Sequence, residues 1–168
     1  MKRIDTKMMV VLGLLIAIQI VLSRFLSISA WNVKIGFGFV PIVVAAMLYG
    51  PLPAGIAYAL SDLLGALLFP VGPFFPGFTL TAFLTGMTYG LFLHKKQSVA
   101  CIAGAVAVSQ LVLSLLINSF WISLLYSTPY LPLLATRILQ CAVLIPTEFF
   151  VIGTITKSIG LYGRRVLT

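Results

Sequence analysis

Long uninterrupted apolar runs dominate this chain of 168 residues. The first run, MMVVLGLLIAIQIVLS, begins at Met8, and similar runs recur almost to the C-terminus. Hydrophobic residues make up 61% of the chain, charged residues only 8%, and the mean hydropathy is +1.15. Because soluble domains carry about a quarter charged residues, this chain cannot shield its apolar surface from water. It is predicted to be an integral membrane protein.

The apolar runs predict helices rather than the strands of a membrane barrel. A spanning helix needs about 20 apolar residues, whereas barrel strands alternate apolar and polar side chains. The runs here are continuous, so we expect an all-α integral membrane protein, with residues 1–168 forming one domain of six transmembrane helices. The expected helices cover residues 7–23, 39–49, 54–69, 78–93, 99–125 and 133–159. Turns rich in Pro and Gly, such as Gly50–Pro53 and Pro70–Gly77, separate several of them.

The distribution of cations predicts the orientation of these helices. With six spans, both termini lie on one side, together with the turns at Gly50–Pro53 and His94–Gln97. Eight cations fall on that side: Lys2, Arg3, Lys7, Lys95, Lys96, Lys157, Arg164 and Arg165. The other side holds three: Arg24, Lys34 and Arg137. The positive-inside rule therefore predicts cytoplasmic N- and C-termini.

The stretch after the first helix, RFLSISAWNVKIGFGFVP, differs from its apolar surroundings. It contains two cations, Arg24 and Lys34, with Trp31, an asparagine and two glycines. Such a stretch is not suited to face lipid. We interpret it as an ordered extracellular loop that forms the lid of a binding site for an anionic, aromatic small molecule.

The three outer cations run against the topological bias and need another explanation. They can neutralise an anion at the outer mouth, Arg by gripping a carboxylate with two donors and Lys as a point charge. The alternative is that they are interfacial side chains reaching toward water. For Arg24 and Arg137 both readings stay open, whereas Lys34 is favoured as functional because an aromatic and an amide residue flank it.

Two acidic residues, Asp62 and Glu148, lie inside predicted membrane helices. A carboxylate there costs about 2.5–3.5 kcal/mol on insertion scales, which makes each a candidate functional residue. Carboxylate oxygens can accept two N–H donors from the edge of a pterin or guanine ring. Asp62 is the first candidate for this role and Glu148 the second. Either can instead be a structural partner for a buried arginine or a polar network.

Aromatic and amide residues gather near the same outer side. Phe74, Phe75 and Trp121, with Trp31 of the lid loop, can stack on a flat ring, although aromatic belts at membrane interfaces have a similar composition. Asn118 can complete the hydrogen bonds of the ring or bind a neighbouring helix.

Catalytic and metal-binding motifs are absent from the sequence. It contains no GxxxxGK[ST] phosphate loop, no HExxH or GxSxG motif and no His/Cys cluster. We therefore expect a protein that is not an enzyme and needs no cofactor or metal. The net charge of +8 is spread over helix ends rather than gathered in a block, so nucleic acid is not an expected partner.

Two motifs carry a family resemblance: the lid stretch RFLSISAWNVKIGFGFVP and the segment GPLPAGIAYALSDLLGALLFPVGPFFPGFTL. With them the chain resembles, over nearly its whole length, the folate-specific substrate-binding subunit (S component) of energy-coupling factor (ECF) transporters. The resemblance implies a multi-pass protein of the bacterial plasma membrane that captures a vitamin from outside beneath the lid loop. It also implies a transmembrane coupling protein and two cytoplasmic ATPases as partners, and delivery of the vitamin by reorientation of the subunit in the lipid bilayer.

The resemblance also implies residue roles. Gly13 and Ala17 match the small-xxx-small motif by which the first helix of the family docks on the coupling protein, although Gly replaces the usual Ala. The folate carboxylates are expected near Arg24, Lys34 and Arg137. The rings are expected among Trp31, Phe74, Phe75 and Trp121, with the pterin edge at Asp62 and Asn118.

Three other functions stay open. An S component for another vitamin (riboflavin, thiamine or a queuosine precursor) would have the same architecture. An autonomous secondary transporter would use Asp62 and Glu148 as a proton relay, and would be driven by a pH gradient without ATPases. A purely structural membrane subunit would bind no small molecule.

Overall fold

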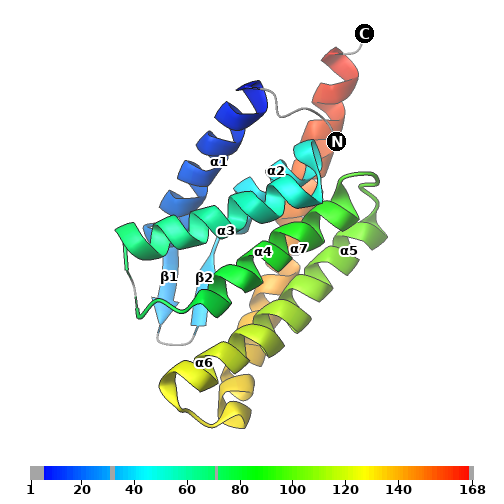
Figure 1. The fold of residues 1–168 in the computed structure, drawn as a ribbon. Coiled ribbons are helices and arrows are strands. Elements are labelled where there is room, and N and C mark those ends of the chain that lie inside the picture. The colour runs from blue at the N-terminus through cyan, green and yellow to red at the C-terminus, as the bar shows by residue number, and fades with distance from the viewer. Residues whose placement is uncertain (1–5, 31–32, 71, 167–168) are drawn as a thin grey trace.

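The computed structural model describes residues 6–30, 33–70 and 72–166, with side chains outside 28–35 and 159–166, as a helical bundle (Figure 1). The elements in chain order are α1 (Thr6–Arg24), β1 (Ser27–Ala30), β2 (Val33–Gly36), α2 (Phe39–Tyr49), α3 (Pro51–Leu68), α4 (Pro76–Leu93), α5 (Val99–Ala107), η1 (Val108–Asn118), α6 (Ser119–Tyr126) and α7 (Tyr130–Val166). Helices α5, η1 and α6 follow one another without a break. The described chain thus contains six helical segments, and the predicted helical class is confirmed.

Within the described part of the chain, four segments are long and apolar enough to cross a membrane. These are Thr6–Arg24, Pro51–Leu68, Val99–Tyr126 and Tyr130–Ser158. Helix α2 has only 11 residues, yet it forms the centre of the core, because its Ile42, Val43, Ala45 and Ala46 are fully buried. The surrounding longer helices therefore separate much of this short helix from the lipid.

The sequence led us to expect a loop after α1, but the structure contains two short strands there. Strands β1 and β2 form an antiparallel hairpin in which Ser27 pairs with Gly36 and Ala30 with Val33. A Cβ at Gly36 would lie 2.6 Å from Ser27 Cβ, so this register requires glycine. The serines, valine and isoleucines of the hairpin alternate as a short strand requires, and β2 contacts α7.

The turn between α2 and α3 is tighter than predicted. It consists of Gly50, whose φ of 89° is readily adopted by glycine. Helix α3 already begins at Pro51, because proline fits the first helical turn, where no N–H partner is needed. The backbones of α3 and α4 then touch: a Cβ on Gly90 would lie 2.2 Å from Pro51 Cα, and one on Gly86 2.5 Å from the carbonyl oxygen of Ala54.

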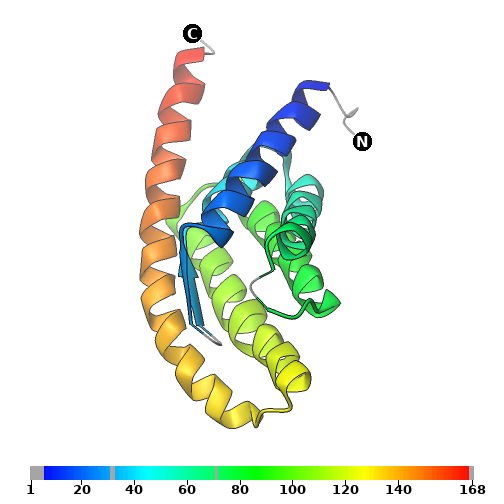
Figure 2. The same cartoon turned by 90° about the vertical axis from the view of Figure 1, so that its left-hand side faces the viewer.

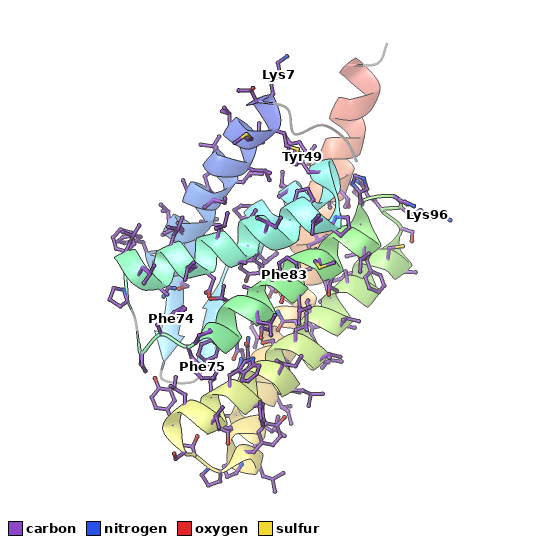
Figure 3. All side chains as sticks on the ribbon, viewed as in Figure 1. Lys7, Tyr49, Phe74, Phe75, Phe83 and Lys96 are labelled. Carbon is purple, nitrogen blue, oxygen red and sulfur yellow. The ribbon has the colours of Figure 1, made fainter. Side chains whose placement is uncertain are left out.

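The two ends of the bundle differ. In Figures 1 and 2 the N-terminal end of α1 and the C-terminal end of α7 lie at one end of the bundle, whereas the hairpin and α6 extend toward the other end. We call these the terminal end and the hairpin end. Figure 3 places Lys7 and Lys96 toward the terminal end and Phe74 and Phe75 toward the hairpin end.

Candidate functional site

A cavity of about 400 Å³ opens between the hairpin and the helices. Its volume falls within the usual range for small-molecule sites. Helices α1, α3, α4, η1 and α7 each contribute polar side chains to its wall. These polar residues are Gln19, Ser23, Arg24, Tyr58, Asp62, Thr81, Thr85, Tyr89, Ser109, Gln110, Ser114, Asn118, Arg137, Gln140 and Glu148. The hairpin adds Ser27 and Gly36 to the lining, so it covers part of the cavity.

Arg24 reaches the cavity from the last turn of α1. Its Nη2 lies 4.0 Å from Asp62 Oδ1, and the two side chains are 12% and 26% exposed. Asp62 Oδ2 accepts a hydrogen bond from Thr79 at 3.0 Å. Gly65 makes this path possible, because a Cβ there would lie 2.9 Å from Arg24 Nε. The Nε group is buried and donates to no protein atom, so part of the guanidinium is left for a ligand.

Arg137 is a buried cation without an acidic partner. The residue is 5% exposed. Its Nη2 donates to Ser114 Oγ over 3.4 Å, its Nε has no acceptor, and no carboxylate of the described chain lies within 4.0 Å. A charge buried without a counter-ion is strongly unfavourable. The arrangement therefore calls for an anion in the cavity.

Aromatic rings form one wall at the hairpin end. Phe74 and Phe75 line the cavity. The Phe75 ring packs against Trp121, with centroids 5.5 Å apart, and Trp121 Nε1 donates to Thr81 Oγ1 at 3.0 Å. Gly77 leaves room for both rings, since a Cβ there would lie 2.6 Å from each. The result is a fixed apolar surface suited to a flat ring.

A buried polar cluster joins α4, η1 and α7 deeper in the bundle. Glu148 Oε1 accepts from Gln110 Nε2 at 2.6 Å, and Glu148 Oε2 accepts from the Tyr89 hydroxyl at 2.9 Å. Ser109 Oγ lies 3.1 Å from the Tyr89 hydroxyl. All four residues are buried and line the cavity.

The middle of the fifth helical segment is a π-helix rather than the regular α-helix that the sequence predicts. It spans Val108–Asn118 and carries the cavity-lining Ser109, Gln110, Ser114 and Asn118. Asn118 Oδ1 is buried and accepts no hydrogen bond. π-Helical turns are frequent at functional sites, and here the wider turn presents polar groups of one helix to one cavity.

Comparison with known proteins decides the family. Residues 7–160 match the family model of the ECF transporter substrate-specific component. The folate transporter FolT of Clostridium novyi is 39% identical over 153 residues, covering 90% of this chain and 88% of the relative. This chain belongs to the substrate-specific (S) components of ECF transporters.

Two further similarities fit this S component. FolT of Leuconostoc mesenteroides is 31% identical over 153 residues, covering 87% of this chain and 82% of the relative. A crystal structure of FolT bound with folic acid superposes with a TM-score of 0.87 and 32% identity, covering 92% of this chain and 95% of the other. The relatives are named as transporters rather than enzymes, and the family is one of membrane proteins.

The structure brings together most of the side chains that the sequence marked in this S component. Six of them line the cavity: Arg24, Asp62, Phe74, Phe75, Asn118 and Arg137. Trp121 stands behind Phe75 instead of lining the cavity. Trp31 and the side chain of Lys34 lie outside the described part of the chain. Only the backbone of Lys34 is described, and it pairs with Ser29 in the hairpin.

The remaining marked residues lie elsewhere. Gly13 and Ala17 are on an exposed face of α1, and a Cβ on Gly13 would meet nothing within 4 Å. Sequence reasoning missed Gln110, and also Gln19, which is 3% exposed and has a buried, unpaired Oε1. A glutamine in a long apolar run was the available signal in both cases.

Proposed function

We propose that this chain is the folate-binding subunit of an ECF importer. The observation that carries the proposal is the buried Arg137, which lines the cavity with no carboxylate of the described residues as its counter-ion. The names of the relatives and the folic acid bound to the similar FolT structure support folate as that anion.

The glutamate end of folate supplies the missing anions. Its two carboxylates pair with Arg24 and Arg137, whose Nε groups are both buried and unpaired, and Lys34 on β2 adds a third cation. Asp62 acts through Arg24, because its two oxygens already meet Arg24 and Thr79. A guanidinium suits this role since its planar fork matches carboxylate geometry.

The ring end of folate extends away from these cations. Phe74 and Phe75, with Trp121 behind Phe75, pack against the aromatic part, and Asn118 Oδ1 accepts a hydrogen bond from it. Glu148 follows Arg137 by 11 residues on α7, a distance of about 16 Å along a helix. An elongated ligand with acids at one end and a polar ring at the other suits such a separation.

The hairpin end is the extracellular side, and the hairpin is the lid. Eight of the 11 cations of the chain were assigned to the opposite side from sequence, and the positive-inside rule makes that side cytoplasmic. Ser27 and Gly36 of the hairpin line the cavity, which supports the lid role. Residues 1–168 then form a single six-helix domain of the bacterial plasma membrane.

Energy for uptake comes from partners. The exposed Gly13 and Ala17 allow close approach of another helix, and they form the docking face for a transmembrane coupling protein that works with two ATPases. The S component reorients on this partner and delivers folate to the cytoplasm. The family membership supports this arrangement.

Calorimetric titration of the purified protein in detergent tests the proposed ligand. We expect one-to-one binding of folic acid and no heat from riboflavin or thiamine. Binding of riboflavin or thiamine in place of folic acid would contradict the ligand but keep the architecture. If a folded protein gave no binding heat with any of the three ligands, the proposed function would be contradicted.

A further inference from the structure

The deep polar cluster contains one acceptor that the protein leaves unused. Gln110 is 6% exposed and lines the cavity. Its Oε1 atom is buried and receives no hydrogen bond. A buried acceptor without a donor is destabilising, so this oxygen is suited to a donor that arrives with the ligand.

The orientation of the Gln110 amide is fixed by Glu148. The amide nitrogen donates to Glu148 Oε1 at 2.6 Å, and the other carboxylate oxygen accepts from Tyr89 at 2.9 Å. Because Glu148 accepts on both oxygens, it takes the NH2 side of the amide and leaves the carbonyl side of Gln110 without a partner.

Neighbouring donors are already used. The Tyr89 hydroxyl donates to Glu148, Ser109 Oγ donates to the carbonyl of Val106 at 3.1 Å, and Cys141 Sγ donates to the backbone oxygen of Gln110 at 3.5 Å. Each of these protons has an acceptor other than Gln110 Oε1.

We infer that Gln110 Oε1 accepts a hydrogen bond from an exocyclic amine on the fused ring of the ligand, and that Glu148 is the positioning residue that holds it there. This inference rests on the proposed function and adds to it the protein atom that recognises the fused ring of the ligand. The carboxylates at positions 62 and 148 are both engaged by protein donors. The neutral amide of Gln110 therefore makes the hydrogen bond to the ring that the sequence led us to expect from Asp62 or Glu148.

A ligand pair isolates this hydrogen bond. Folic acid carries a 2-amino group, and its 2-desamino-2-methyl analogue replaces that donor with a methyl group of similar size. We expect the wild-type protein to bind folic acid about tenfold or more tightly than the analogue, since the analogue leaves a buried acceptor unpaired. Gln110→Met should reduce this ratio to near one, whereas Gln97→Leu, an exposed glutamine in the turn before α5, should keep it.

Glu148→Gln tests the positioning role with little change of shape. The new amide can donate to Gln110, which then turns its NH2 group to the cavity and loses the preference for an amine. The ratio of the two dissociation constants is the readout, because a merely structural loss weakens both ligands alike. A ratio unchanged from wild type in Gln110→Met or in Glu148→Gln would overturn the inference. Tight folic acid binding by the same wild-type protein would leave the proposed function intact.

Discussion

Arg137 is the residue on which the ligand assignment depends most. Arg137→Gln should weaken folic acid binding, because a hydrogen bond to a charged group contributes about 1.5–3 kcal/mol, or roughly ten- to a hundredfold in Kd. Isothermal titration measures the change. Lys96→Gln, which removes a cation at the terminal end, serves as the control. A variant that binds like wild type would show that Arg137 does not meet the ligand.

Single residues of the site were only partly predictable. Charges in a membrane segment stand out in a sequence because they are costly there, and Arg24, Asp62 and Arg137 do line the cavity. Their pairing was not visible, since Asp62 meets Arg24 across two helices. Uncharged glutamines carry a weaker signal, and the role of Gln110 depends on a hydrogen bond to a residue 38 positions away.

Helix packing depends on glycines that admit a neighbouring backbone. Gly90→Ala places a Cβ 2.2 Å from Pro51 Cα, and overpacking of this kind costs about 1–3 kcal/mol. We expect a lower midpoint of thermal unfolding in detergent. Gly153→Ala is the matched control because nothing lies within 4 Å of its Cβ. Equal midpoints for the two variants would show that the α3–α4 contact is looser than described.

The open face of α1 should act in partner docking and not in ligand binding. Gly13→Leu fills a site where a Cβ meets nothing within 4 Å, so folding and folic acid affinity should stay unchanged. Co-purification of the coupling protein should fall, because bulk there blocks close approach of a helix. Gly153→Leu, the same change on α7, should retain the partner. Undiminished co-purification of Gly13→Leu would remove this face from the docking surface.

The helices were predictable as elements because apolar length and proline or glycine turns dictate them. The bounds of α2 were predicted to the residue, at Phe39–Tyr49. The hairpin was not, since its register rests on the close contact of Gly36 with Ser27. The π-helix was also missed, because polar residues four apart, such as Gln110 and Ser114, share one face of a π-helix and of an α-helix alike.

The whole molecule places cations and an aromatic wall toward the hairpin end of one cavity and a polar cluster deeper inside. Such an axis suits one orientation of an elongated ligand, with its acids near Arg24 and Arg137 and its ring toward Gln110 and Glu148. The proposed orientation of the ligand therefore depends most on its two carboxylates.

Equilibrium binding of folic acid and its α,γ-diamide to the wild-type protein tests most directly whether the ligand carboxylates pair with Arg24 and Arg137. The diamide keeps the rings and the length of folic acid but removes both negative charges. We predict that folic acid binds at least about tenfold more tightly, because the diamide offers the arginines neutral acceptors and loses both ion pairs. Equal affinities would contradict the assignment of the buried arginines to the glutamate end.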